Sequence, residues 1–166
     1  EEIRAISGDC VCCGSREELV SSLEAFSHTP GSIAVVETNG TTDAEQLIEM
    51  LSLEPGLDKF TLPIQVSLID GKRWQKRFWH NALEREQART AAHVIISRQD
   101  VVDAKRLEEV KNSLREHKVR GQIGTVETVS AELAKVVARA GIVSARLVEK
   151  ASCGCDHDHC EHEGHS

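Results

Sequence analysis

Short β-branched runs alternate with amphipathic helical segments along this chain, and that alternation limits its fold more than any other feature. The predicted strands are residues 33–38 (IAVVET), 62–70 (LPIQVSLID), 93–97 (HVIIS) and 121–126 (GQIGTV). Continuous apolar runs are typical of strands buried on both faces of a parallel sheet. Because helices connect successive strands by right-handed crossovers, the sequence predicts an α/β fold, a mostly parallel sheet with flanking helices.

The predicted helices also have recognisable ends. They cover residues 15–27, a segment that begins at Asp43, residues 74–92, a segment that begins at Asp103, and residues 130–141. Ser15 and Glu18 match a capping box at the first helix start. Gly141 is expected to end the last helix, because glycine readily adopts the left-handed conformation that follows a helix.

Composition excludes several classes of protein. Aromatic residues make up 3% of the 166 residues and there is no Tyr, so the core must be aliphatic. A formal charge of -7 argues against a nucleic-acid or anionic-membrane surface. Six cysteines, clustered and without a visible signal peptide, indicate a reducing, cytoplasmic setting and metal or redox chemistry rather than a disulfide framework.

The composition divides the chain into a core and a tail. Residues 1–150 carry the predicted core, and residues 151–166 form a Cys/His-rich tail that is predicted to be disordered because it has almost no apolar side chains. The candidate metal ligands of the tail are Cys153, Cys155, His157, His159, Cys160, His162 and His165. Thiolates and imidazoles are preferred ligands of Zn²⁺, so the tail is predicted to bind metal; an idle, solvated tail is the alternative.

A second group of thiols precedes the first predicted helix. Cys10, Cys12 and Cys13 occupy three of four positions just before the capping box. A helix N-terminus lowers the pKa of a thiol and so favours the thiolate that metals require. Three thiolates leave one position of a tetrahedron for another ligand, which suits an ion that is transferred. Small buried hydrophobic residues and a redox pair are the alternatives.

Four segments together resemble one family. The segments are ISGDCVCCGSREELVSSL, IAVVETNGTTDAEQLIEML, EREQARTAAHVIISRQDVVD and RLEEVKNSLREH, between about residues 3 and 126. They are similar to the CobW-type metallochaperone GTPases, and the Cys-x-Cys-Cys segment is the most specific part. The resemblance implies an incomplete P-loop GTPase-like core. It also implies that Cys10, Cys12 and Cys13 bind a divalent metal, usually Zn²⁺, and that GTP and Mg²⁺ act in the complete protein.

The same resemblance implies roles for residues that follow two predicted strands. Glu37 and Gly40 would belong to the catalytic switch that senses the terminal phosphate and Mg²⁺. Asp100 would read the guanine, with Ser97 and Arg98 beside it in the nucleotide site. These two residues stand where the family usually has Asn and Lys, and Ser97 cannot reproduce the amide of Asn.

Two parts of the family pattern do not occur within these 166 residues. The P-loop, Gly-x-x-x-x-Gly-Lys-Ser/Thr, is expected upstream of Glu1, and the C-terminal domain is also missing. Without the P-loop nothing cradles the phosphates. The sequence therefore predicts a zinc-binding metallochaperone-type protein whose metal transfer to an acceptor protein is coupled to GTP in the complete protein; whether it forms a homo-oligomer stays open.

Two other functions are compatible with the sequence. The first is a non-enzymatic zinc-buffering or delivery module on a degenerate GTPase core. The second is a thiol redox protein that uses Cys12 and Cys13, although the histidines of the tail would serve no purpose in such chemistry.

Overall fold

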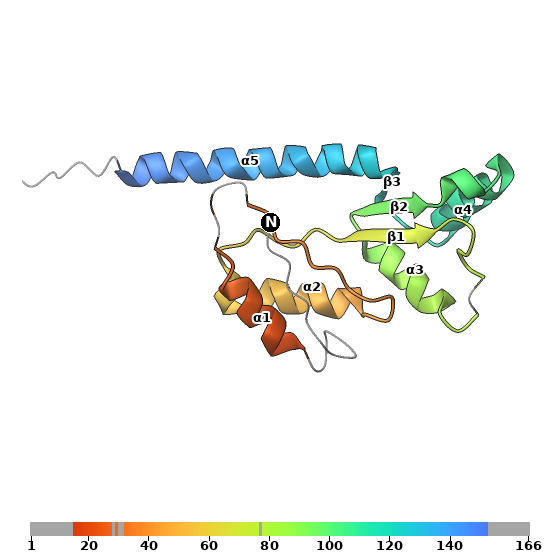
Figure 1. Ribbon diagram of the computed structural model, residues 1–166, viewed down its shortest axis with the longest axis horizontal. Coiled ribbons are helices and arrows are strands. Elements are labelled where there is room, and N and C mark those ends of the chain that lie inside the picture. Colours follow the sequence, from red (N-terminus) through yellow and green to blue (C-terminus); the bar gives the residue numbers. More distant parts are fainter. Residues whose placement is uncertain (1–14, 28, 30–31, 77, 153–166) are drawn as a thin grey trace, which may run out of the picture.

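The computed structural model describes residues 15–27, 29, 32–76 and 78–152, with side chains as far as residue 140. Within these residues the elements follow one another as in Figure 1. They are α1 (Arg16–Glu24), α2 (Ala44–Leu53), the short 3₁₀ helix η1 (Pro55–Leu57), β1 (Val66–Asp70), α3 (Asn81–Thr90), β2 (His93–Ser97), η2 (Gln99–Val101), α4 (Ala104–Glu116), β3 (Gln122–Gly124) and α5 (Val126–Ser152).

The sheet in the described part of the chain has three parallel strands in the order β1-β2-β3. Ile69 of β1 pairs with Ile96 of β2, and Val94 of β2 pairs with Ile123 of β3. The helices between these strands lie against the sheet (Figure 1). This confirms the predicted α/β fold with a parallel sheet, and it confirms HVIIS as a central strand, with the boundaries that the sequence predicts.

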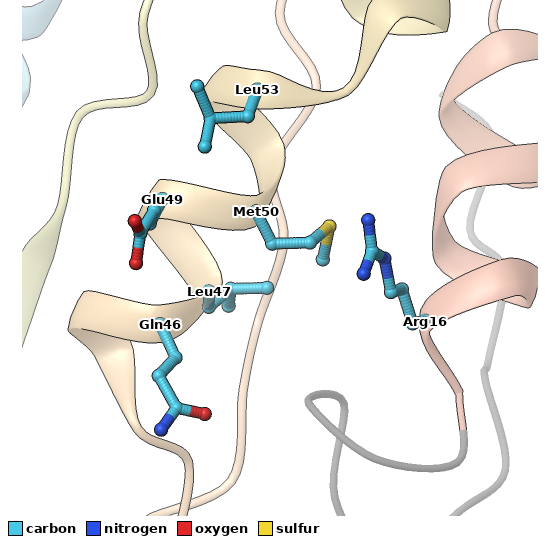
Figure 2. Close-up of a pocket in the computed structure, with 6 residues that line it drawn as sticks. All are labelled: Arg16, Gln46, Leu47, Glu49, Met50 and Leu53. Atoms are coloured by element: carbon cyan, nitrogen blue, oxygen red, sulfur yellow. The ribbon is translucent and has the colours of Figure 1, made fainter.

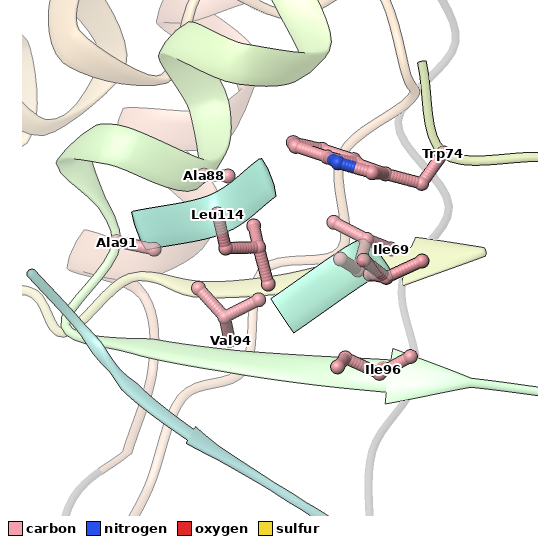
Figure 3. Close-up of a cluster of buried hydrophobic side chains, with 8 residues drawn as sticks. Ile69, Trp74, Ala88, Ala91, Val94, Ile96 and Leu114 are labelled. Carbon is pink, nitrogen blue, oxygen red and sulfur yellow. The ribbon is translucent and has the colours of Figure 1, made fainter. Parts of the chain in front are cut away.

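The main core lies between the sheet and helices α3 and α4. It is formed by Ile69, Trp74, Ala88, Ala91, Val94, Ile96, Val110 and Leu114. Figure 3 shows the Trp74 and Leu114 side chains directed toward the strand residues. Trp74 is the one aromatic member of this cluster, so the prediction of an aliphatic core is correct for the other residues and wrong for Trp74.

Helix α5 packs against β2 and β3, and Val129 in its first turn is buried. Ile95, on the face of β2 opposite Val94, is buried as well. Leu68 of β1 stays 68% exposed. Among the described residues, no helix has the length and hydropathy needed to cross a membrane.

A second, smaller group of contacts joins α1, α2 and η1. Leu19, Leu47 and Leu57 are buried there. Lys59 extends its ammonium group to the carbonyl oxygens of Glu24 (2.6 Å) and Phe26 (3.1 Å), which lie at the end of α1. These two carbonyls have no further turn of helix to accept from, so the lysine acts as a cap from another segment.

The prediction of a buried strand at residues 33–38 is wrong. The segment pairs with no strand of the described sheet, and Ile33 and Val35 are 58% and 86% exposed. β-branched residues favour an extended backbone, but a strand exists only where a neighbour accepts its hydrogen bonds. Sequence pattern specifies the first condition and not the second.

Two helix boundaries and one helix cap also differ from the prediction. Helix α3 begins at Asn81 instead of residue 74, because Asp70 begins a turn in which its carbonyl oxygen accepts from Trp74 N (2.7 Å). Helix α5 continues through Gly141 to Ser152, since one glycine costs only about 1 kcal/mol in a helix interior. Ser15 makes no side-chain capping bond, because its backbone (φ -113°, ψ 12°) is not in the extended conformation of a capping residue.

The two tryptophans provide a test of this core. Trp74 is 1% exposed and Trp79 is 87% exposed. Trp74→Ala should lower the free energy of unfolding by about 3–5 kcal/mol, because it leaves a large cavity. Trp79→Ala, the matched control, should change it by less than about 0.5 kcal/mol. Urea unfolding followed by circular dichroism measures both; equal losses would show that Trp74 does not anchor the core.

Candidate functional site

The carboxyl ends of β1 and β2 form the first part of the candidate site. The Ser97 hydroxyl donates to the carbonyl oxygen of Ile69 (2.9 Å), and the carbonyl oxygen of Ser97 accepts from Gly71 N (3.1 Å). Two hydrogen bonds therefore join the carboxyl ends of β1 and β2, where both strands leave the sheet. In open α/β sheets, ligands bind at this edge.

Arg98 and Asp70 face each other across that edge. Arg98 has a left-handed backbone (φ 57°, ψ 35°), which is uncommon for a residue with a Cβ. Its Nη1 lies 3.4 Å from Oδ2 of Asp70. Oδ1 of Asp70 accepts from the backbone N–H groups of Lys72 (2.9 Å) and Arg73 (3.2 Å). The carboxylate is thus engaged on both oxygens by its own loop and by the neighbouring one.

Asp100 lies one turn further, in η2, and its side chain is exposed. Gln99 beside it donates from Nε2 to the carbonyl oxygen of Ile96 (2.8 Å), which fastens the start of η2 to the end of β2. The structure therefore brings Ser97, Arg98 and Asp100 to one edge, with a carboxylate facing solvent.

The segment from Glu37 to Asp43 forms a separate, well-bonded loop. Oδ1 of Asn39 accepts from Thr41 N (3.1 Å), the Thr41 hydroxyl (2.8 Å) and the hydroxyl of Thr42 (2.9 Å), whose side chain is buried. Asp43 then accepts from Gln46 N (3.1 Å) and caps α2, as its position in the sequence predicts. Glu37 is exposed just before this turn.

Gly40 in the same loop has no conformational need to be glycine. Its backbone is outside the left-handed region, and a Cβ built there would meet nothing within 4 Å. Glycine at such a position leaves the backbone open to close approach by a ligand.

Hydrogen bonds place this loop at the other end of the sheet. The Gln87 side chain donates to the carbonyl oxygens of Gly40 (3.3 Å) and Thr42 (2.8 Å). The carbonyl oxygen of Gln87 accepts from the Gln65 side chain (2.7 Å), and Gln65 O accepts from His93 N (3.3 Å). Gln65 and His93 lie at the amino ends of β1 and β2. The structure therefore does not bring Glu37 and Gly40 to the edge that carries Asp100.

The predicted metal ligands fall outside the described residues. These are Cys10, Cys12 and Cys13 before α1, and the seven Cys and His residues of the tail from Cys153 to His165. Within the part of the chain that the structure describes, no three His, Cys, Asp or Glu side chains are grouped closely enough to hold a metal ion. The two cysteine-containing segments therefore hold the whole of the thiol chemistry, because all six cysteines of the chain belong to them.

Comparison with protein families gives one match. The model of the CobW/HypB/UreG nucleotide-binding domain matches residues 1–124. This chain belongs to the CobW/HypB/UreG family. The search of curated proteins and the search of solved structures each returned no significant match. The family is one of metallochaperone-type GTPases that bind nucleotide.

The range of the CobW/HypB/UreG match agrees with the structure. It begins ahead of Cys10, and it ends at Gly124, which is also the last residue of β3. The loop with Glu37 and Gly40 and the edge with Asp100 both fall inside it. Helix α5 and the tail lie beyond the matched residues.

Sequence reasoning missed a hollow between α1 and α2. The cavity has a volume of about 320 Å³ and is lined by Arg16, Gln46, Leu47, Glu49, Met50 and Leu53. Figure 2 shows the Met50 side chain directed toward Arg16. Arg16 also donates from Nη2 to Oε2 of Glu54 (3.1 Å). Spacing of apolar residues along α2 predicts a buried face, but only the tertiary structure shows that α1 leaves part of this face uncovered.

The Asn39 loop is testable by a pair of substitutions. Asn39→Ala removes the acceptor of the buried Thr42 hydroxyl and should lower the free energy of unfolding by about 1–3 kcal/mol. Asn39→Asp keeps the acceptor oxygen and should cost less. Urea denaturation monitored by circular dichroism compares the two variants. Equal stability of Asn39→Ala and the unchanged protein would contradict the described loop.

Proposed function

We propose that this protein carries zinc as cargo for an acceptor protein, with Cys10, Cys12 and Cys13 as the principal ligands and the tail as a secondary store. In the complete protein, metal transfer is coupled to GTP. The observation that carries the proposal is the family match over residues 1–124, which includes the cysteine segment and the strand edge in one domain.

The chemistry of the thiol segment supports the proposal. Arg16 opens α1 three residues after Cys13, so the cysteines directly precede a helix N-terminus. The partial positive charge at this end favours thiolates, and thiolates are the ligands that Zn²⁺ prefers. Glu17 and Glu18 in the first turn add negative charge that attracts a divalent cation.

The nucleotide part of the proposal rests on the edge with Asp100. An exposed carboxylate at the carboxyl end of a parallel strand fits a hydrogen-bond acceptor for the N–H groups of a guanine. Ser97 uses its hydroxyl to hold Ile69, and Arg98 is engaged by Asp70. Of the three residues, Asp100 is thus the one proposed to contact the base.

One observation favours the second candidate, a zinc-buffering or delivery module without GTP hydrolysis. The loop with Glu37 and Gly40 is tied through Gln87 to the amino end of the sheet, away from Asp100. A switch that responds to the terminal phosphate must reach the same nucleotide as the base-reading residue. In this arrangement the loop with Glu37 and Gly40 lies at one end of the sheet and Asp100 lies at the other.

Zinc binding distinguishes the two groups of ligands. Competition with a chelator should reveal one tight Zn²⁺ site and several weaker ones in the full chain. Truncation after Lys150 should remove the weaker sites, because it removes the seven Cys and His ligands of the tail. The variant with Cys10, Cys12 and Cys13 changed to Ser should lose the tight site. Affinity of that site should fall at lower pH, since protons compete for thiolates.

Two results would contradict the zinc-binding proposal. A truncated chain that binds no zinc would show that the three cysteines are not a site by themselves in this chain. A serine variant that keeps the tight site would place it in the tail. Circular dichroism of each variant checks that the fold is unchanged.

Nucleotide binding is the second test. The 166-residue chain should bind a fluorescent GTP analogue weakly and should not hydrolyse GTP, because its sequence contains no phosphate-cradling P-loop. Asp100→Ala should abolish the preference for the GTP analogue over the corresponding ATP analogue. Asp58→Ala, at another exposed carboxylate, is the matched control. GTP turnover by this chain would overturn the expectation, and equal binding of both nucleotides would favour the zinc-buffering module.

A further inference from the structure

Two aromatic side chains stand on the surface at one point. Phe78 and Trp79 are 82% and 87% exposed, and their rings meet edge to face with centroids 5.0 Å apart and an interplanar angle of 86°. The chain has only three Phe and two Trp. Two of its five aromatic residues therefore lie exposed in a surface pair, while one, Trp74, lies in the main core.

The loop that presents this pair is held from its buried side. Arg106 of α4 donates from Nε to the carbonyl oxygen of Gly71 (3.0 Å) and from Nη2 to that of Trp74 (2.7 Å). Nε1 of the buried Trp74 donates to the Ser113 hydroxyl (3.0 Å), also in α4. The first half of the loop is thus fixed to the core.

Gln75, the residue after Trp74, is held by hydrogen bonds from and to α3. Gln75 has a left-handed backbone (φ 57°). Its N–H donates to Oε2 of Glu84 (3.2 Å), its carbonyl oxygen accepts from Asn81 Nδ2 (3.1 Å), and its side-chain oxygen accepts from Arg85 (2.7 Å). Loop residues that are hydrogen-bonded to the core before binding lose little further entropy on binding, so exposed rings near them suit a recognition surface.

The charge around the pair is opposite to that of the whole chain. Residues 71–80 contain four Lys and Arg and no Asp or Glu, in a chain of formal charge -7. Lys72, Arg73 and Lys76 are exposed. The carboxylate of Asp70, just before the loop, accepts from backbone N–H groups of the loop and lies nearer to Arg98 (3.4 Å) than to Arg73 (3.9 Å). One carboxylate shared between Arg73 and Arg98 leaves a net positive charge on the loop, which can attract a negatively charged partner.

We propose that Phe78 and Trp79, with Lys72, Arg73 and Lys76 at their rim, form a docking site for an acidic segment of a partner protein. An apolar side chain of the partner packs on the aromatic pair while its carboxylates meet the cations. Trp and Arg are enriched among the residues that dominate protein interfaces. Opposite charge at the rim accelerates encounter and selects the partner.

Two other classes of macromolecule fit the surface less well. A single-stranded nucleic acid stacks its bases on open ring faces, but in an edge-to-face pair one ring covers a face of the other. An anionic membrane attracts cations over a broad surface, and a chain of charge -7 offers only this short positive loop. A short protein segment can bind to the aromatic pair and the cations of this loop alone.

The loop leaves β1 directly after Asp70, beside Ser97 and Arg98. A partner on this loop would therefore sit next to the strand edge that carries Asp100. Docking at this loop requires neither zinc nor GTP, so it can be tested on the protein without either.

The experiment selects partners from a library of short random peptides displayed on phage, with the 166-residue chain as bait. Enriched peptides should combine Asp and Glu with an aromatic or large aliphatic residue. A synthetic copy of the most enriched peptide, followed by fluorescence anisotropy, should bind about tenfold or more weakly to Phe78→Ala/Trp79→Ala and to Lys72→Glu/Lys76→Glu. Its binding should also weaken as salt is raised.

Matched controls carry the same chemical change elsewhere. Leu53→Ala/Leu62→Ala removes two side chains that are 72% and 74% exposed, and Arg120→Glu/Arg139→Glu makes the same change of charge on other surfaces. Both should bind the peptide as the unchanged chain does. Circular dichroism confirms that all four variants are folded.

Three results would overturn the proposal. The first is a selection that enriches no acidic peptides. The second is an enriched peptide that binds the loop variants as well as the unchanged chain. The third is binding to phosphatidylcholine–phosphatidylserine vesicles, or to a single-stranded oligonucleotide of about 20 nucleotides, that the loop variants abolish while no acidic peptide binds.

Discussion

The burial of Trp74 connects more of this structure than any other single contact. Its ring belongs to the core between the sheet and the helices, its indole N–H donates to Ser113 of α4, and its carbonyl oxygen accepts from Arg106 of the same helix. Because Trp74 follows β1 by only four residues, these contacts hold α4 against the end of that strand. They also explain why Trp74 lies in a loop and not in the predicted helix.

This arrangement sets the geometry of the strand edge. The Ser97 hydroxyl and Gly71 N–H join the ends of β1 and β2, and Asp70 forms an ion pair with Arg98, whose backbone is left-handed. Asp100 is thereby left exposed at the edge where members of such α/β folds bind ligands. The Asn39 loop is equally well bonded but is attached through Gln87 to the opposite end of the sheet. The two groups of family residues are thus separately supported.

Local signals in the sequence predicted the parts of the fold that depend on local chemistry. The strand His93–Ser97, the capping roles of Asp43 and Asp103, and the apolar face of α4 with Val110 and Leu114 are all as expected. Parts that depend on a distant neighbour were not predictable. The run at residues 33–38 has the composition of a buried strand but pairs with no strand in the described part of the chain. Trp74 and Gln75 were expected in a helix but lie in a loop, where they are bonded to Arg106 and Glu84.

For the candidate site, the sequence alone supplied the candidates: the six cysteines and the histidines of the tail by residue type, and Glu37, Gly40 and Asp100 by resemblance to the family. Residue type and spacing are enough for this, because thiolates, imidazoles and carboxylates bring their reactivity with them. Only the tertiary structure decided that Glu37 and Gly40 lie at the other end of the sheet from Asp100, and that Trp74 is buried while Phe78 and Trp79 are exposed. The physical reason is that burial and proximity are set by contacts between segments far apart in the chain, such as Trp74 with Ser113, which no local pattern encodes.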